Sequence, residues 1–240
     1  MPKSVFHFKQ FSIQQDRCAM KVTTDACILG AWANLKNAKQ ILDIGTGTGL
    51  LALMAAQRSR AEIDAIEIDA DAATQAKENM RASKFNQRIR VLNKDVRKFL
   101  PRRKYDHIIC NPPFYSGSLR SSDTKKNKAK HSTELTIPEL MTAIVRLSTK
   151  DARVSLLFPG NRDSLPVFES MLINGFIAER FRGIRDNPGK KYIHSALLEF
   201  KRGLAKPEPV DMLLINDSSG KWSADYKNLM RDFYLDVEAK

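Results

Sequence analysis

Residues 40–57 read QILDIGTGTGLLALMAAQ, and this stretch decides the fold class. Its first part, residues 41–44, is mostly apolar and predicts a short buried strand. Three glycines at alternate positions follow, and residues 50–57 then predict a helix. The glycines are Gly45, Gly47 and Gly49. A strand, a glycine turn and a helix in this order are typical of an α/β fold with a mostly parallel sheet.

The spacing of the glycines limits the ligands that this turn suits. A dinucleotide loop needs G-x-G-x-x-G so that a pyrophosphate can sit on the helix N-terminus, but Leu50 stands at the position of the third glycine. No Gly-Lys-Ser/Thr follows, which excludes a P-loop that cradles phosphates. Glycine still permits positive φ and a close approach of the backbone to a ligand. The turn therefore suits a nucleoside without phosphates, of which S-adenosylmethionine is the common example.

Acidic residues stand at or beside the ends of the first three predicted strands. Asp43 precedes the glycines and could accept a hydrogen bond from a cofactor ammonium, directly or through water; bracing the loop is the alternative. Glu67 closes the second strand, where a carboxylate can accept both ribose hydroxyls. Asp69 is a rival for this role, although it also suits the first turn of the next helix. Asp95 follows the third strand, Ile89–Leu92, and could accept the exocyclic amine of adenine or be a solvated loop acid.

The tetrapeptide Asn-Pro-Pro-Phe at 111–114 follows a fourth predicted strand over Tyr105–Cys110. The Asn111 side chain and the Pro112 backbone each offer a carbonyl, and two prolines stiffen the turn because proline fixes φ at about −65°. Phe114 offers a ring on which a flat group can stack. An exocyclic amine could donate one hydrogen bond to each carbonyl, which would free its lone pair to attack an electrophile. A strand that ends in a rigid turn is the alternative interpretation.

The four strand ends together favour a site. In an open α/β sheet, ligands bind outside the carboxyl ends of the strands, so we expect these groups to meet at one edge. The predicted cofactor contacts are Asp43, Gly45, Thr46, Gly47, Gly49, Glu67, Ile68, Asp95 and Val96. The predicted catalytic residues, which would hold the target group, are Asn111, Pro112, Pro113 and Phe114.

These residues resemble the class I, Rossmann-like S-adenosylmethionine-dependent methyltransferases. The DIGTGTG of residues 43–49 is similar to the cofactor loop of that family, and NPPF to the motif of its amino-methyltransferases. Residues 16–60 resemble most specifically the bacterial enzymes that methylate N6 of adenosine 37, beside the anticodon of a valine tRNA. The resemblance implies S-adenosylmethionine as cofactor and tRNA as substrate. It also implies the ribose role for Glu67, the adenine role for Asp95 and the target-base role for residues 111–114.

We expect a Rossmann-like class I methyltransferase fold with a mostly parallel seven-stranded sheet and helices on both faces. Apolar runs at 176–184 and 192–200 predict an antiparallel closing hairpin around a basic turn. This single globular domain would span residues 36–240, with residues 1–35 as an N-terminal lid or extension. Further predicted elements are a helix over 25–33 capped by Thr23 or Thr24, helices over 138–148 and 161–174, a linker at 206–210 and a final helix over 223–234.

The formal net charge of +13 and the pI of about 9.7 favour a polyanionic partner, although a generally basic soluble protein is the alternative. The lysine-rich segment 116–134 adjoins the target motif and could bind phosphates, or it could be a solvated loop without a role. The candidate RNA contacts are Arg17, Lys21, Lys125, Lys126, Lys128, Lys130, His131, Lys190 and Lys191.

Three scattered cysteines are too few for a disulfide framework or a zinc site, so we expect no metal. The N-terminus lacks the apolar core of a signal peptide, and no apolar run approaches the roughly 18 residues of a membrane span. We therefore expect a cytoplasmic protein with no membrane partner. The alternatives to a tRNA methyltransferase are a protein glutamine-N5 methyltransferase, a DNA or ribosomal-RNA amino-methyltransferase, and a non-catalytic RNA-binding module. The sequence leaves the oligomeric state open.

Overall fold

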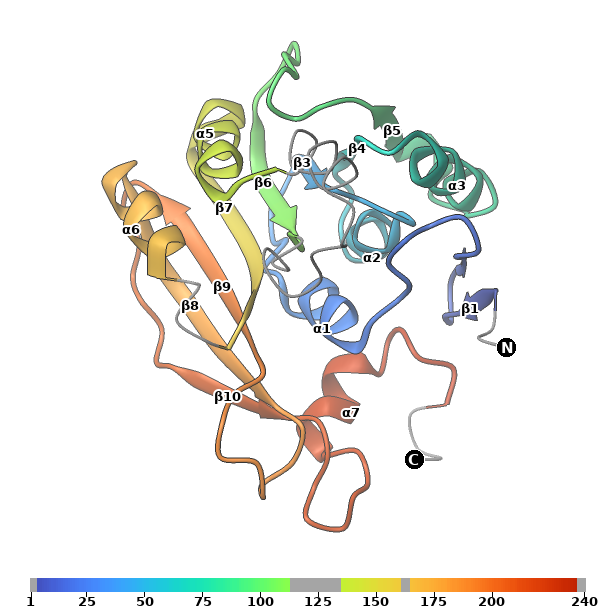
Figure 1. Cartoon of the computed structure of the whole chain (residues 1–240), viewed down its shortest axis with the longest axis vertical. Coiled ribbons are helices and arrows are strands. Elements are labelled where there is room, and N and C mark those ends of the chain that lie inside the picture. The colour runs from blue at the N-terminus through green and yellow to red at the C-terminus, as the bar shows by residue number, and fades with distance from the viewer. Residues whose placement is uncertain (1–3, 113–134, 161–164, 237–240) are drawn as a thin grey trace, which may run out of the picture.

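A single sheet runs through the molecule (Figure 1). The computed structural model describes residues 4–112, 135–160 and 165–236, and within them this sheet has eight strands. In sheet order the strands are β10 (Asp211–Leu214), β8 (Phe176–Arg185), β9 (Ser195–Arg202), β7 (Ser148–Pro159), β6 (Tyr105–Cys110), β3 (Gln40–Ile44), β4 (Glu62–Glu67) and β5 (Ile89–Asn93). Every neighbouring pair is parallel except the two pairs that contain β9. The predicted α/β class, the mostly parallel sheet and the antiparallel hairpin are confirmed.

The expected number of seven strands was wrong, because β10 adds an eighth at the edge of the sheet. β10 pairs in parallel with β8 and places Met212 opposite Gly183. A Cβ on Gly183 would lie 2.6 Å from Met212 Sδ, so the glycine allows close packing between these strands. Within β10 only Leu213 is fully buried, and prolines precede the strand. A four-residue strand with one buried side chain carries too little periodicity to be recognised in sequence.

The second strand of the closing hairpin lies later than predicted, because β9 spans Ser195–Arg202 and not residues 192–200. The turn before it is held by a hydrogen bond from Lys190 N to Asn187 O (3.2 Å). Two apolar residues, Tyr192 and Ile193, stand before the strand, so the pattern alone does not locate its start.

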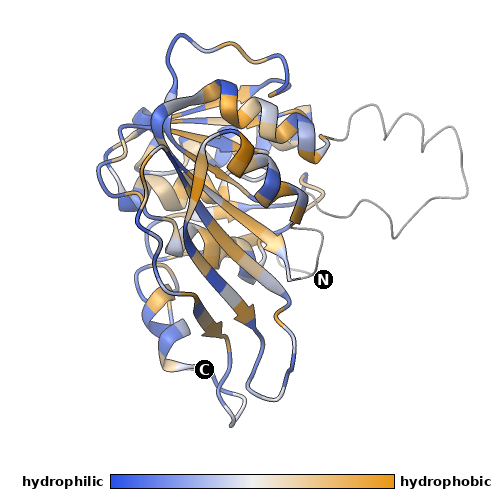
Figure 2. Cartoon of the chain, turned by 90° about the vertical axis from the view of Figure 1, so that its left-hand side faces the viewer, coloured by the Kyte–Doolittle hydropathy of each residue, from blue (hydrophilic) through white to orange (hydrophobic). Residues whose placement is uncertain are grey.

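Helices cover both faces of the sheet, as predicted (Figure 1). They are α1 (Thr24–Trp32), α2 (Leu50–Arg58), α3 (Ala70–Arg81), α5 (Ile137–Leu147), α6 (Leu165–Ile173) and α7 (Ala224–Met230). Side chains of α1, α2 and α7 belong to one hydrophobic cluster, and those of α5 and α6 belong to a second. In β3, Ile41 joins the first cluster, whereas Leu42 joins the second, because successive side chains on a strand point to opposite faces. Figure 2 shows the resulting concentration of hydrophobic residues along the strands.

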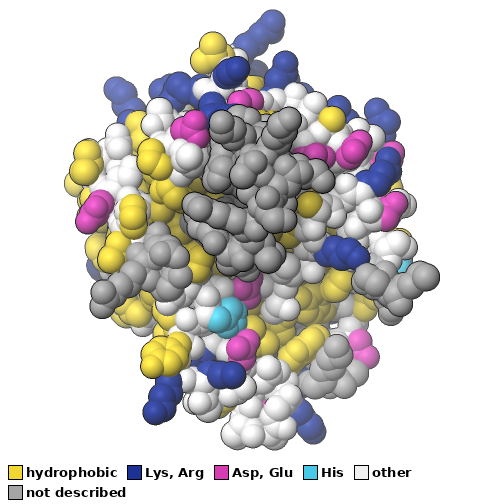
Figure 3. All heavy atoms as spheres, viewed as in Figure 1, with side chains coloured by type: hydrophobic (Ala, Val, Ile, Leu, Met, Phe, Trp, Pro, Cys, Tyr) yellow, Lys and Arg dark blue, Asp and Glu magenta, His cyan; other side chains and the backbone are white. Residues whose placement is uncertain are grey.

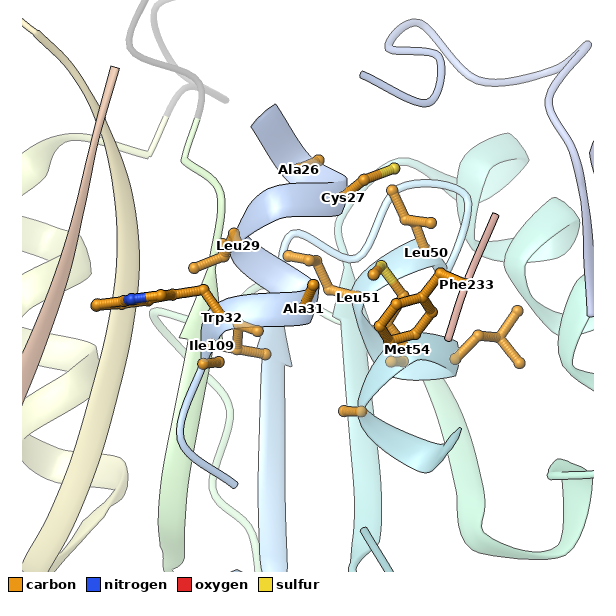
Figure 4. Packing of buried hydrophobic residues seen from close by; sticks show 14 of the residues in the cluster. Ala26, Cys27, Leu29, Ala31, Trp32, Leu50, Leu51, Met54, Ile109 and Phe233 are labelled. Atoms are coloured by element: carbon orange, nitrogen blue, oxygen red, sulfur yellow. The ribbon is translucent and has the colours of Figure 1, made fainter. Parts of the chain in front are cut away.

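Helix α1 is almost entirely buried against α2 (Figure 4). Thr23 caps the helix by accepting a hydrogen bond from Ala26 N at 3.2 Å. The helix starts and ends one residue before the predicted bounds of 25–33. A Cβ on Gly30 would lie 2.5 Å from Met54 Sδ, so the glycine brings the two helices close together. Arg58 donates to the carbonyls of Gly30 and Ala33 at the other end of α1. These contacts fix the position of the chain that enters α1.

Two short strands, β1 (Val5–His7) and β2 (Ser12–Gln14), form a hairpin near which the segment after α7 lies. Phe8 forms an isolated bridge with Tyr234 and stacks on Phe11 at 4.6 Å between ring centroids. The predicted helix over 223–234 was wrong at its C-terminus, because α7 ends at Met230 and the chain turns so that Tyr234 reaches Phe8. Phe8 and Tyr234 are far apart in sequence, so no local pattern predicts their contact.

Two other predicted helices were close to their observed bounds. Helix α5 begins one residue before the predicted start and carries a capping box of Thr136 and Glu139. The helix predicted over 161–174 corresponds to α6, although residues 161–164 lie outside the described part of the chain, and Gly175 at φ +78° ends it as expected. None of the helices in the described residues combines the length and apolar character that a bilayer crossing requires.

Replacing Leu29 by alanine should destabilise the protein strongly, because this α1 side chain is fully buried in the cluster of Figure 4. We expect Leu29→Ala to lower the free energy of unfolding by about 2–5 kcal/mol in urea denaturation. Leu100→Ala is the matched control, since Leu100 is 82% exposed, and should change stability by less than about 0.5 kcal/mol. Equal losses in both variants would contradict the packing of α1.

Candidate functional site

A cavity of about 770 Å³ opens at the carboxyl ends of the parallel strands β3, β4, β5 and β6. The residues of its wall that the sequence singled out are Arg17, Lys21, Gly45, Thr46, Gly47, Glu67, Ile68, Asp69, Asp95, Val96, Asn111 and Pro112. The structure therefore brings the glycine turn, two carboxylates and the end of β6 to one edge of the sheet. Asp43 and Gly49 lie behind this wall.

A second cavity, of about 800 Å³, opens at the opposite, amino ends of the strands. Three of its polar side chains are engaged with one another, because Arg90 and Tyr105 both donate hydrogen bonds to Asp64. None of the residues predicted to bind a ligand lines it. The cavity at the carboxyl ends is therefore the candidate site.

The glycine turn has the positive φ angles that its glycines permit. Gly45, Gly47 and Gly49 have φ of +70°, +54° and +88°, a region that residues with a Cβ rarely adopt. A Cβ on Gly45 would have no heavy atom within 4 Å, so the backbone there is open to a ligand. A Cβ on Gly49 would instead collide with Met80 Cε, so this glycine allows α3 to pack against the turn.

Glu67 ties the glycine turn to the start of α3. Its Oε2 accepts a hydrogen bond from Gly47 N (2.9 Å), and its Oε1 accepts one from Asp69 N (3.0 Å). A carboxylate has about four lone-pair sites, so two remain for ligand hydroxyls. The rival, Asp69, caps α3 by accepting from Ala72 N at 2.8 Å. Both carboxylates line the cavity, and the ribose role of Glu67 stays a prediction.

Asp43 is fully buried beneath the turn. Its Oδ2 accepts hydrogen bonds from Thr46 Oγ1 (2.5 Å) and Ala52 N (3.1 Å), so this oxygen braces the loop. Its Oδ1 has no hydrogen-bond partner among the described residues. Burial raises the pKa of Asp43 to about 7, although the hydrogen bonds from Thr46 and Ala52 oppose this shift. These contacts show that Asp43 braces the loop. A contact between Asp43 and a ligand, directly or through water, stays a prediction.

Asp95 lies on the cavity wall and is held by Arg97. Its Oδ1 accepts from Arg97 N and from the Arg97 guanidinium, both at 2.9 Å. The hydrogen bond from the Arg97 side chain lowers the pKa of Asp95, so the carboxylate is ionised and can accept a further hydrogen bond. Arg97 also reaches Glu139 at 3.4 Å, which connects this carboxylate to the start of α5.

Asn111 and Pro112 complete the cavity at the end of β6, where Asn111 is half-buried. The pairing of Cys110 with Ile44 places these residues beside the glycine turn that follows β3. The other predicted target-binding and phosphate-binding residues of this region lie outside the described residues. They are Pro113, Phe114, Lys125, Lys126, Lys128, Lys130 and His131.

The remaining candidate RNA contacts have different surroundings. Arg17 forms an ion pair with Glu78, and its backbone N donates to Gln75 Oε1 at 3.1 Å. Lys21 is exposed at the mouth of the cavity. Lys190 and Lys191 are exposed in the turn before β9. On the face shown in Figure 3, Lys and Arg side chains lie mainly along the rim.

The sequence analysis did not single out Cys18, which also lines the cavity. Its Sγ lies 3.8 Å from the position that a Cβ on Gly47 would take, so the segment before α1 covers the glycine turn. Burial, together with the negative charges of Glu67 and Asp69, raises the pKa of the Cys18 thiol to about 11. The thiol therefore stays neutral and serves as an apolar wall. Cys18 lies within the stretch of strongest family resemblance, residues 16–60, but that resemblance assigned it no role. Groups of three or more His, Cys, Asp or Glu side chains that could hold a metal ion are absent from the described residues.

The buried carboxyl of Asp43 should make stability depend on pH. Between about pH 4 and 7 the folded protein keeps a proton on Asp43 that the unfolded chain has lost, so stability falls as pH rises through this window. Asp43→Asn removes this titration. We therefore expect the difference in unfolding free energy, Asp43→Asn minus wild type, to rise by up to about 4 kcal/mol between pH 4 and pH 7, measured by urea denaturation. Parallel pH profiles for the two proteins would contradict the burial of an uncharged Asp43.

Comparison with known proteins agrees with this site. The family model of the methyltransferase small domain matches residues 26–138. A tRNA1(Val) (adenine(37)-N6)-methyltransferase from Parabacteroides distasonis is 38% identical over 98% of this chain and 99% of its own length. A protein of the same name from Dyadobacter fermentans is 51% identical over 68% of this chain and 69% of its own length.

Among solved structures, a predicted O-methyltransferase from Agrobacterium tumefaciens superposes with a TM-score of 0.66. The superposition covers 87% of this chain and 96% of that chain at 19% sequence identity, which shows the shared Rossmann-like class I methyltransferase fold. The identity to relatives over nearly the full length of both chains is far higher. The chain therefore belongs to the family of tRNA1(Val) (adenine(37)-N6)-methyltransferases.

Proposed function

We propose that this protein transfers a methyl group from S-adenosylmethionine to the exocyclic N6 of an adenine in tRNA. The target is adenosine 37, next to the anticodon of a valine tRNA, as the names of the relatives state for those proteins. One observation carries the proposal. Asn111 and Pro112 end β6 on the wall of the same cavity that holds the glycine turn, Glu67 and Asp95.

The residues present fit this cofactor. Glu67 has two lone-pair sites left for the ribose hydroxyls after its bonds to Gly47 N and Asp69 N. Asp95 is held in its ionised form by Arg97 and would accept the adenine amine. Ile68 and Val96 stand on the wall beside these carboxylates and offer apolar surface to the adenine ring. Gly45 leaves the backbone open to close approach.

Asn111 and Pro112 supply the chemistry at the target base. When bound, the cofactor provides an electrophilic methyl group on a sulfonium. The Asn111 side-chain carbonyl and the Pro112 backbone carbonyl accept the two N6 hydrogens and aim the nitrogen lone pair at that methyl. The base must leave its stack to reach the cavity, and Phe114, which lies outside the described residues, would stack on it. Catalysis then consists mainly of positioning and electrostatics.

This reaction requires no strong base before the transfer, because the nitrogen loses its proton to water afterwards. The nearby ionisable groups agree with that order of events. Burial raises the pKa of Cys110, next to Asn111, far above the ordinary value of a thiol. Burial lowers the pKa of His107 to about 3, and its Nε2 is engaged with Ser155 Oγ at 3.0 Å. Neither side chain can act as a general base at the cavity.

A polyanionic substrate agrees with the net charge of +13. The exposed cations Lys21, Lys190 and Lys191 supply candidate phosphate contacts on the described surface. We further propose a cytoplasmic location and one Rossmann-like domain over residues 36–240. Residues 1–35 would form its lid or extension, an assignment supported by the cavity wall that residues 17–22 provide.

Analysis of methylated products tests the function directly. We expect the protein and S-adenosylmethionine to produce N6-methyladenosine in unmodified tRNA, measured by mass spectrometry of nucleosides. DNA, ribosomal RNA and release factor are offered in parallel. N5-methylglutamine in the release factor without a methylated nucleoside would contradict the tRNA assignment, and an absence of any methylated product would contradict catalysis.

Asn111→Ala should separate catalysis from cofactor binding. The variant loses one acceptor for the target amine, so we expect turnover to fall about 100-fold or more while the Kd for S-adenosylmethionine stays within about twofold. Asn174→Ala is the matched control, because Asn174 is exposed in a turn after α6. A folded Asn111→Ala protein with near wild-type turnover would refute the proposed role.

A further inference from the structure

We propose that Tyr192, in the turn between β8 and β9, stacks on an unpaired base of the substrate RNA beside the target nucleotide, while Lys190 and Lys191 contact its phosphates. This proposal rests on the proposed function and extends it by assigning a second contact with the RNA. It concerns residues that stand outside the cavity.

Tyr192 presents its ring to solvent between charged neighbours. Its relative exposure is 83%, far above that of a ring which packs on the protein, and Lys190 and Lys191 before it are also exposed. The combination of an aromatic ring and adjacent lysines matches single-stranded nucleic acid, in which every base has a flat face and every step a phosphate. A protein partner would instead be expected to need a wider apolar patch around the ring.

The turn that carries Tyr192 has a defined shape. Lys190 N donates to Asn187 O, and Gly189 N donates to Asn187 Oδ1 at 3.0 Å. The guanidinium of Arg185 donates to Lys190 O at 3.2 Å. Stacking on this ring would therefore order little further backbone, which keeps the entropic cost of binding low.

The residues after Tyr192 fasten this turn to the site. His194 O accepts from Gly160 N (2.8 Å) just after β7, and a Cβ on Gly160 would collide with the backbone of Ile193. His194 Nε2 lies 3.1 Å from Asp25 Oδ1, and Ser195 Oγ donates to Asp25 as well. Asp25 is in the first turn of α1, directly before Ala26 on the cavity wall. The contact between His194 and Asp25 thus joins the segment that follows Tyr192 to the start of α1 beside the cavity.

Opposite charges strengthen the contact between His194, at the end of the turn, and Asp25 in α1. The hydrogen bond that His194 donates to Asp25 raises the pKa of His194 above 6.5. Burial alone would raise the pKa of Asp25, but the hydrogen bonds from His194 and Ser195 lower it below 3.8. Asp186 lies 3.4 Å from the other ring nitrogen of His194. The acidic groups near the turn therefore face His194, whereas Lys190 and Lys191 stay exposed to a polyanion.

The position of the turn suits the substrate. In Figure 1 the turn lies at the lower end of the molecule, beside the loop between β10 and α7. Hydrogen bonds from Asn216 to Asp186 O hold the two loops together. RNA-binding proteins read unpaired loop bases by stacking them on aromatic rings, and an anticodon loop offers such bases on both sides of its position 37. Ser195 pairs with Pro159 at the end of β7 and with Ile184 near the end of β8, so the turn lies at the same edge of the sheet as the cavity.

Binding of an anticodon stem-loop RNA tests the proposal, with Tyr192→Ala and Tyr192→Phe compared by fluorescence anisotropy at several salt concentrations. We expect Tyr192→Ala to weaken RNA binding about 5- to 150-fold and to raise KM for RNA, with kcat and the Kd for S-adenosylmethionine unchanged. Tyr192→Phe keeps the ring and should bind as the wild type does. Thermal unfolding shows that each variant is folded.

The two lysines are tested by their effect on salt dependence. Replacing Lys190 and Lys191 by alanine should make the slope of log K against log salt about 1 to 2 less steep. Lys36 and Lys39, at the opposite edge of the sheet, form the matched control pair and should leave the slope unchanged.

Two failures remain distinguishable. If the wild type binds and methylates the RNA and Tyr192→Ala equals it in affinity and KM, the stacking role is refuted and the proposed function stands. If the wild type neither binds nor methylates the RNA, the proposed function is refuted and the stacking role with it.

Discussion

The parallel pairing of β3, β4, β5 and β6 is the constraint on which the site depends. Backbone hydrogen bonds place Ile44 beside Ile66 and beside Cys110, so all these strands end at one edge of the sheet. Groups that lie 20 to 70 residues apart in sequence are thereby brought to the wall of one cavity. No side chain has to be long for this to occur, because the sheet sets the spacing of the strand ends.

The carboxylates at this edge are divided between support and recognition. Asp43 is buried and braces the glycine turn through Thr46, and its raised pKa reflects the loss of solvation on burial. Glu67 and Asp95 lie on the wall and are fixed by backbone N–H groups and by Arg97. Fixed carboxylates lose little freedom when they accept ligand hydrogen bonds, so this arrangement suits specific binding of a nucleoside.

The sequence allowed most of the sheet to be predicted, because short apolar runs bounded by glycine, proline or acidic residues are local signals. The end of β6 and the glycine turn were located for this reason. β10 was missed because it contributes one buried side chain, and the start of β9 was set too early because Tyr192 and Ile193 in the turn are also apolar. Contacts across long sequence separations lay beyond any local pattern, including Tyr234 on Phe8, Cys18 over the glycine turn and His194 on Asp25. The identities of the ligands came from family resemblance, since spacing alone leaves several nucleosides possible.

The central claim is that one cavity holds both the methyl donor and the target amine. A crystal structure with S-adenosylmethionine bound tests it most directly. The account predicts the ribose hydroxyls within hydrogen-bond distance of Glu67, the adenine amine at Asp95 and the methyl group directed at the side chain of Asn111. A donor bound outside this cavity, or one whose methyl group points away from Asn111, would contradict it.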